Sequence, residues 1–302
     1  MLDFLTDELS AALRHVNLHR VYELRLRAGK PVVVNYGGTY AYLGERGIGQ
    51  ESSLALRVSY GDLETIVYRA SEYSVYSVTE QLRQGFLTGA GGERIGLAGI
   101  FVYENGSVFT VKEVTSLNIR VPHEVIGCGD FIYEQCFAAG ARSALLLSAP
   151  GRGKTTILRD LARSLSKSGI VNILINDERN EICAAVRDFS LDVGPFADIV
   201  RYTYKSDALV SAVRAMRPDI IITDELVSAE EIGAVAACVR GGIRVIASAH
   251  CKDVESLRAS PVFGQALHEK LFERYIFLSF DGVGEVSSIF DGELRPLYER
   301  PC

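Results

Sequence analysis

Three features are missing from the 302-residue sequence, and each absence excludes a class of protein. No stretch approaches the run of about 18 apolar residues that a membrane-spanning helix needs. The start at Met1–Phe4 has neither the basic nor the apolar region of a signal peptide. The six cysteines form no Cys-x-x-Cys pair and no Cys/His metal spacing. We therefore expect a soluble cytoplasmic protein with reduced thiols and no transmembrane segment.

An excess of basic residues is also absent. The formal net charge is −6 and the isoelectric point is near 5.5, which argues against a general affinity for nucleic acid. What is present is an ordinary globular composition, 48% apolar and 23% charged. A chain of this length is expected to form roughly two domains.

The first part of the chain predicts a mixed α+β domain over residues 1–125. Apolar residues at helical spacing predict a helix within Met1–Asn17, and alternating residues from Tyr22 to Leu43 predict a small antiparallel sheet. A further helix is expected over Asp62–Ala70. Two β-branched runs around Asn105-Gly106 predict a hairpin, because both turn residues accept positive φ. A linker near residues 122–129 then leads into a second domain, residues 126–302.

The second domain begins with the strongest motif of the sequence. A short apolar strand from Ala144 runs into the turn Ser148–Thr155, SAPGRGKT, and then into a helix. The turn fits the P-loop pattern except that Ser148 replaces the first glycine. Its backbone N–H groups would face a β-phosphate, Lys154 would reach the β- and γ-phosphates, and the Thr155 hydroxyl would bind Mg²⁺. The predicted nucleotide-binding set is Pro150, Gly151, Arg152, Gly153, Lys154, Thr155 and Thr156.

Carboxylates follow two later apolar strands. The strand within Arg217–Glu225 ends in Asp224-Glu225, a Walker B pattern in which Asp224 would hold Mg²⁺ through water. The run Ile170–Ile175 ends at an acidic segment that contains Glu178. Either Glu178 or Glu225 is a candidate for the general base that activates the attacking water. Because the carboxyl ends of parallel strands meet at one edge of a sheet, these groups are expected near the P-loop.

A later strand, Ile243–Ala249, ends at His250, which would contact the γ-phosphate or the attacking water and report hydrolysis. Strands starting near residues 144, 170, 198, 219 and 243 alternate with helical segments, which predicts a largely parallel sheet with helices on both faces. Two further runs, Arg274–Phe280 and Gly284–Phe290, predict a terminal hairpin.

Taken together, these residues resemble the stage III sporulation protein AA family, within the secretion-ATPase branch of the RecA-like P-loop proteins. Nearly the whole chain takes part in the resemblance. The segments that carry it are Glu23–Arg27, Gly91–Gly96, Ser116–Arg120, the P-loop through Asp160, Asp177–Ile182, Met216–Glu225 and Ala247–His250.

The resemblance implies an α/β fold with a RecA-like P-loop ATPase core that follows the smaller α+β domain. It also implies ATP and Mg²⁺ as cofactors and a ring, most simply a homo-hexamer. That ring would lie at the cytoplasmic face of a membrane channel and contact the channel proteins of the sporulation apparatus. In such proteins the acidic segment after the second strand supplies the catalytic glutamate, which favours Glu178 slightly over Glu225.

One segment departs from the expected family pattern. Phe196-Ala197 stands where an Arg-Thr pair is expected, so the charge of that arginine is absent. Arg201, Arg240 and Arg244 are candidate substitutes. The departure keeps a second hypothesis open, a nucleotide-dependent structural adaptor that forms its ring on ATP and hardly turns it over. A nucleic-acid motor is a third possibility, against which the acidic composition speaks.

Overall fold

The computed structural model describes residues 2–71, 79–83, 85–104, 106–168, 171–186, 189–201, 209 and 214–300. The chain divides into two compact units. The first unit holds Met1–His123 together with Ala184–Ser190, and the second holds Glu124–Cys183 and Leu191–Cys302. The helical segment that the sequence predicts between the strands near residues 198 and 219, Ser206–Met216, lies largely outside the described residues, as does Asn105 of the expected hairpin turn.

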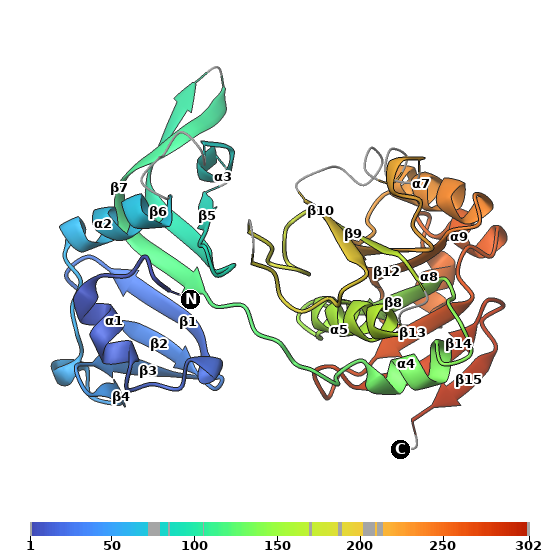
Figure 1. Ribbon diagram of the computed structural model, residues 1–302, viewed down its shortest axis with the longest axis horizontal. Helices are drawn as coiled ribbons and strands as arrows, with labels where there is room; N and C mark the ends of the chain where they lie inside the picture. Colours follow the sequence, from blue (N-terminus) through green and yellow to red (C-terminus); the bar gives the residue numbers. More distant parts are fainter. Residues whose placement is uncertain are drawn as a thin grey trace. The chain divides into compact units, whose positions relative to one another are not determined.

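The first unit is an antiparallel sheet with short helices (Figure 1). The strand order is β4-β3-β2-β1-β7-β6-β5. The strands are β1 Val21–Arg27, β2 Val33–Tyr36, β3 Thr39–Gly44, β4 Gly47–Gly49, β5 Phe86–Thr88, β6 Arg94–Glu104 and β7 Ser107–Arg120. The helices are α1 Asp7–Leu13, α2 Tyr60–Ala70 and α3 Thr79–Arg83, with 3-10 turns at Leu18–Arg20 and Ser52–Leu54.

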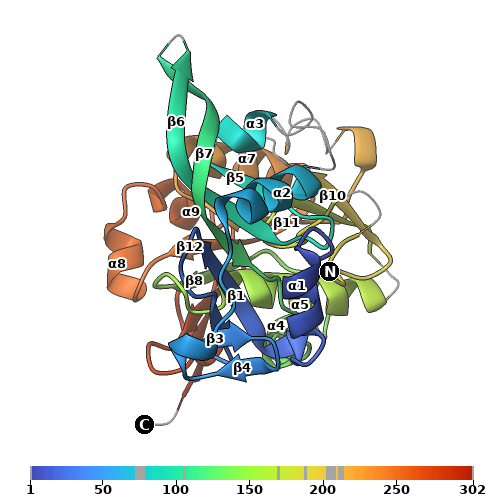
Figure 2. The same ribbon diagram turned by 90° about the vertical axis from the view of Figure 1, so that its left-hand side faces the viewer.

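Alternation along the strands sets the core of this unit. Leu24 and Leu26 of β1 are buried on the face that also receives Leu117 and Ile119 of β7. Charged and polar residues between them, such as Arg25, lie on the other face of the sheet. The first helix is shorter than the expected Met1–Asn17, because only Asp7–Leu13 is helical. The long β6–β7 hairpin extends beyond the remaining strands (Figure 2).

The second unit is a mostly parallel sheet in the order β10-β9-β11-β12-β8-β13-β14-β15. The strands are β8 Ala144–Ser148, β9 Ile173–Asp177, β10 Ala197–Arg201, β11 Ile220–Glu225, β12 Arg244–His250, β13 Arg274–Leu278, β14 Val286–Asp291 and β15 Pro296–Glu299. The helices are α4 Asp130–Cys136, α5 Lys154–Lys167, α7 Ala229–Arg240, α8 Val254–Ala259 and α9 Gly264–His268. β15 was not anticipated from the sequence, and the terminal hairpin has a longer loop than expected.

Helices cover both faces of this sheet, as the alternation of strands and helices predicts. Residues of α7, α8 and α9 share a core with one face of β8, β11 and β12, and α5 packs on the same strands without belonging to that core. All five residues of β8 and of β9 are buried, which is typical of parallel strands covered on both sides. Polar chemistry is therefore confined to the ends of these strands, where the backbone leaves the sheet.

Candidate functional site

The turn between β8 and α5 has the conformation that a P-loop requires. Gly151 and Gly153 have φ of +73° and +88°, values that residues with a side chain rarely adopt. Ser148 keeps a negative φ, so the missing first glycine does not prevent the turn. The loop opens onto a cleft of about 430 Å³ lined by Pro150, Gly151, Arg152, Gly153, Lys154, Thr155, Thr156, Arg179, Glu181, Asp224, Glu225, Ser248, His250 and Val283.

Lys154 is only 7% exposed and folds back onto the start of its own loop. Its Nζ donates to the carbonyl oxygens of Ser148 and Ala149 and to the Ser148 hydroxyl, each at 3.2 Å. Ser148, which replaces the first glycine of the P-loop pattern, thus supplies one acceptor for the ammonium group. Burial lowers the pKa of Lys154, and the Glu225 carboxylate opposes that shift. A phosphate oxygen in the cleft would be a stronger partner for this cation than these neutral acceptors.

Asp224, Glu225 and His250 lie beside the P-loop because of strand order. β12 separates β8 from β11, and His250 is the register partner of Ser148. His250 Nδ1 lies 2.9 Å from Lys154 Nζ, and its Nε2 lies 3.2 Å from Glu225 Oε1. Glu225 pairs with Ser248 after an irregularity in the β11–β12 register. One chain of contacts therefore joins the lysine, the histidine and the glutamate.

Asp224 and Thr155 also reach the cleft, which is the arrangement that the predicted Mg²⁺ site needs. Asp224 is 8% exposed. In the described ranges no group of three or more His, Cys, Asp or Glu residues could hold a metal ion by itself. This donor set fits Mg²⁺, which usually takes one or two protein oxygens and completes its shell with water and phosphate oxygens.

The acidic segment after β9 is organised by two buried charges. The Asp177 carboxylate accepts backbone N–H groups from Glu181 at 2.8 Å, Ile182 at 3.1 Å and Cys183 at 2.7 Å. Burial raises the pKa of Asp177, while these N–H groups and the charge of Arg159 lower it. Arg159 of α5 in turn donates to the carbonyl oxygens of Glu181 and Ile182. The P-loop helix and the acidic segment are thereby tied together.

This fold of the segment turns its glutamates in different directions. Glu181 and Arg179 line the cleft, whereas Glu178 is not one of the lining residues. Asn180, at φ +54°, makes the tight turn between them, a conformation that asparagine tolerates better than most residues. Sequence reasoning missed Glu181 and Arg179, because spacing alone does not show which side of an irregular loop faces the phosphates.

Comparison with known proteins places this site in a family. Residues 4–295 match the family described as Sporulation stage III, protein AA. The Stage III sporulation protein AA of Bacillus subtilis (strain 168) is 33% identical over 278 residues, which cover 90% of this chain and 87% of that protein. The chain belongs to the sporulation stage III protein AA family. The resemblance drawn from the sequence motifs is thus confirmed.

More distant relatives share part of this stage III AA chain. An uncharacterized protein ycf45 of Cyanidium caldarium is 29% identical over 150 residues, covering 49% of this chain and 44% of that protein. Among solved structures, the Legionella pneumophila ATPase DotB has 13% identity and a TM-score of 0.57, covering 93% of this chain and 79% of its own. The pilus retraction motor PilT with bound ADP has 15% identity and a TM-score of 0.63, and the match covers 91% of this chain and 78% of the PilT chain. These likenesses confirm the predicted α/β P-loop ATPase fold.

The arginines suggested as substitutes in this stage III AA protein lie elsewhere. Arg240 pairs with Glu269 at 2.9 Å, and Arg244 lies 3.8 Å from Glu273. Neither these two nor Arg201 belongs to the described residues that line the cleft. Arg152 and Arg179 are the arginines that do.

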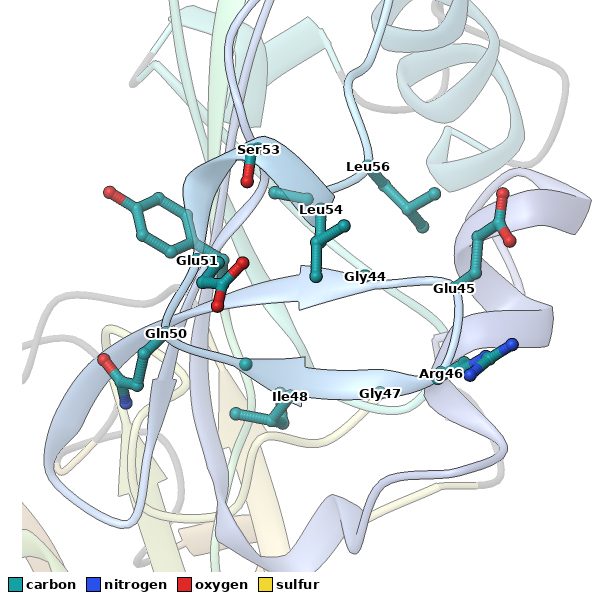
Figure 3. Close-up of a pocket in the computed structure, with 13 residues that line it drawn as sticks. Gly44, Glu45, Arg46, Gly47, Ile48, Gln50, Glu51, Ser53, Leu54 and Leu56 are labelled. Atoms are coloured by element: carbon teal, nitrogen blue, oxygen red, sulfur yellow. The ribbon is translucent and has the colours of Figure 1, made fainter.

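A second pocket in the stage III AA chain is larger but lacks this chemistry. It holds about 790 Å³ beside the β3–β4 hairpin and the segment that follows (Figure 3). Glu45 and Arg46 stand at the hairpin turn, Glu51 and Gln50 stand at the other end, and Leu54 is 72% exposed. None of the described residues that line it belongs to the P-loop, so volume alone does not identify the candidate site.

None of the helices in the described ranges combines the length and the apolar content that crossing a bilayer requires.

Proposed function

We propose that this protein is a Mg²⁺-dependent ATPase that powers or assembles a secretion-like channel during endospore formation. The observation that carries the proposal is the cleft in which Lys154, Asp224, Glu225 and His250 meet at the carboxyl ends of adjacent strands. The membership in the sporulation stage III protein AA family supports the cellular role. The likeness to DotB and PilT supports the fold on which such a cycle runs.

Each cleft residue has a role that follows from its chemistry. The P-loop N–H groups and Lys154 would bind the β- and γ-phosphates, and Thr155 and Asp224 would hold Mg²⁺. Bound Mg²⁺ would neutralise charge on the phosphate oxygens. Arg152 and Arg179, which also line the cleft, would add positive charge near the same oxygens.

We assign the general base to Glu225 rather than to Glu178, which the sequence slightly favoured. Glu225 lines the cleft, and its Oε1 lies 3.2 Å from His250 Nε2. The strand that precedes Glu178, β9, is separated from β8 by β11 and β12. Glu181 is the second candidate, because it is the glutamate of the acidic segment that lines the same cleft. A base must come within hydrogen-bond reach of the water that it activates.

His250 would report the state of the nucleotide. Its Nδ1 lies 2.9 Å from Lys154 Nζ and 3.1 Å from the Ser148 carbonyl oxygen. In one tautomer Nδ1 accepts a hydrogen bond from the lysine, and in the other it donates one to the carbonyl oxygen. When a γ-phosphate draws the lysine away, the histidine loses that partner, keeps its contact with Glu225 and can turn Nδ1 to the phosphate. This exchange would link hydrolysis to β12 and the rest of the unit.

The test is phosphate release by the purified protein with ATP and Mg²⁺, measured beside Lys154→Ala at high protein concentration. Turnover that disappears in the variant supports the hydrolase. Turnover equal to that of the variant would refute it. The matched control is Lys270→Ala, because Lys270 is an exposed lysine outside the cleft and its loss should leave turnover unchanged.

The adaptor remains the second candidate, and the Phe196-Ala197 segment favours it. The charge expected there is absent, while the P-loop that binds nucleotide is intact. Both candidates include a homo-hexameric ring bound peripherally at the cytoplasmic face of a membrane, through channel proteins of the sporulation apparatus, with no nucleic-acid partner. Sedimentation with and without ATP separates the two. ATP-dependent oligomers with negligible phosphate release favour the adaptor, and oligomers with turnover favour the ATPase.

A further inference from the structure

The loop between β13 and β14 contacts the P-loop from the side opposite to the catalytic groups. The backbone N–H of Gly284 donates to the carbonyl oxygen of Arg152 at 3.0 Å. A Cβ placed on Gly153 would lie 3.4 Å from the Gly284 nitrogen and 3.5 Å from Cγ1 of Val283. The loop therefore packs directly against the turn that is expected to hold the phosphates.

Strand order shows on which side of the P-loop the β13–β14 loop lies. β8 lies between β12 and β13, and all three strands are parallel, so their carboxyl ends share one edge (Figure 1). Glu225 and His250 stand on the β11–β12 side of the P-loop, whereas the β13–β14 loop stands on the other side. A nucleotide whose γ-phosphate points toward Glu225 and His250 must extend its nucleoside toward the β13–β14 loop.

The side chain found there is aliphatic. Val283 lines the cleft and is 71% exposed. The loop that carries it is fixed at its base, because Ser279 N–H donates to the Glu285 carbonyl oxygen at 2.7 Å and the Glu285 carboxylate pairs with Arg300. An exposed apolar side chain on an anchored loop, beside a phosphate-binding turn, suits a flat apolar ring.

We propose that Val283 is the platform for the nucleobase of the bound nucleoside triphosphate, which rests on the proposed function of the same cleft. The base packs on the valine side chain by apolar contact. Among the described residues that line the cleft, the remaining polar groups belong to the P-loop or to its catalytic side. The site therefore holds a base firmly without reading its edge, so purines are poorly distinguished.

The test compares ATP, GTP and inorganic triphosphate, each with Mg²⁺, by equilibrium binding to the full-length protein and to Val283→Ala. Triphosphate keeps the phosphate interactions and lacks the base. We expect Val283→Ala to weaken ATP and GTP binding by about three- to tenfold, because less apolar surface is buried against the base, and to leave triphosphate binding unchanged. The unaltered protein should bind ATP and GTP within about threefold of each other.

A matched variant, Leu297→Ala, removes a similarly exposed aliphatic side chain on β15 outside the cleft, and should change none of the three affinities. Unaltered ATP affinity in Val283→Ala would overturn the inference. An equal loss for ATP and triphosphate would also overturn it, because the valine would then support the P-loop rather than the base. Failure of the unaltered protein to bind ATP and triphosphate alike would refute the proposed function itself, and the inference with it.

Discussion

The two sheets of this protein handle polar side chains in opposite ways. In the second unit both faces of the sheet are covered, so every residue of β8 and β9 is buried and chemistry is confined to strand ends. In the first unit β1 buries one face and carries Glu23, Arg25 and Arg27 on the other. In a parallel sheet covered on both faces, topology therefore indicates where a site lies, at the ends of the strands. In an antiparallel sheet with one open face, topology does not indicate where on that face a site would lie.

The largest effect on ATP hydrolysis is expected at the cleft, where charged residues gather at the strand ends of the second sheet. Lys154→Ala removes the cation that would contact the β- and γ-phosphates, together with four polar contacts of its Nζ. We expect ATP hydrolysis to fall by about 10³-fold or more, by analogy with the loss of other preorganised charge-stabilising groups. Phosphate release and nucleotide binding measure the effect. An active variant would show that the strand-end cleft is not the site.

Replacing Glu225, which lines the cleft, should affect turnover far more than replacing Glu178, which does not. Glu225→Gln should reduce turnover by about 10²- to 10⁴-fold, the usual contribution of a general base, and preserve ATP binding. Glu178→Gln is the matched control in the acidic segment, and we expect a change of less than about threefold because Glu178 does not line the cleft. The reverse pattern would restore the assignment that sequence reasoning favoured. A large loss in Glu181→Gln would instead identify that residue as the base.

Local patterns predicted the P-loop and both candidate glutamates, but they could not choose between Glu178 and Glu225, because that choice depends on the order of the strands in the sheet. Ser148–Thr155, Asp224-Glu225 and His250 are local patterns at the ends of apolar strands, so spacing and strand type sufficed to predict them. The order of β8, β12, β11 and β9 depends on crossovers that carry no local signature. Local patterns could not show that the strand following the P-loop in sequence lies three places away from β8 in the sheet. The choice between Glu178 and Glu225 stays a prediction, which the glutamate variants test.

Local sequence patterns also could not predict which residues of the loops line the cleft. The orientation of Glu181 and Arg179 depends on Asp177, which collects three backbone N–H groups, and on Arg159 from another element. Such an irregular turn is determined by tertiary hydrogen bonds rather than by periodicity. In the first unit, by contrast, the alternation of Leu24 and Leu26 with charged residues predicted the strand, and β1 confirms it. That alternation says nothing about what the polar face does.

The next largest effect tests the one-sided packing of the first sheet. Leu26 of β1 is fully buried, so Leu26→Ala should lower the free energy of unfolding by about 2–5 kcal/mol. Arg27→Ala, the next residue and on the other face, should change it by less than about 0.5 kcal/mol. Chemical denaturation followed by far-UV circular dichroism measures both. Equal losses would mean that both faces of this sheet are packed.

A smaller effect is expected at the acidic segment. Asp177→Asn keeps one acceptor oxygen and points an amide NH₂ group at a backbone N–H that the carboxylate now accepts. Leaving a buried donor unsatisfied costs about 1–3 kcal/mol, so the midpoint of denaturation should fall. Hydrogen exchange should accelerate at the N–H groups of Glu181, Ile182 and Cys183. Unchanged exchange at these positions would show that Arg159 alone holds the segment.

The smallest effect on stability is expected at a feature that both units contain, a helix N-terminus closed by a capping box. Ser59 of the first unit and Ser228 of the second each cap a helix in a capping box, the former with Asp62 and the latter with Glu231. Replacing either serine by alanine should cost about 0.5–2 kcal/mol. If the units unfold separately, Ser59→Ala lowers the temperature of one thermal transition and Ser228→Ala lowers that of the other. ATP with Mg²⁺ should raise only the transition that Ser228→Ala lowers, because the proposed nucleotide cleft lies in the second unit. Ser53→Ala, an exposed serine that caps no helix, should shift neither transition. A single transition that both capping variants lower equally would show instead that the covered sheet and the open sheet unfold as one cooperative structure.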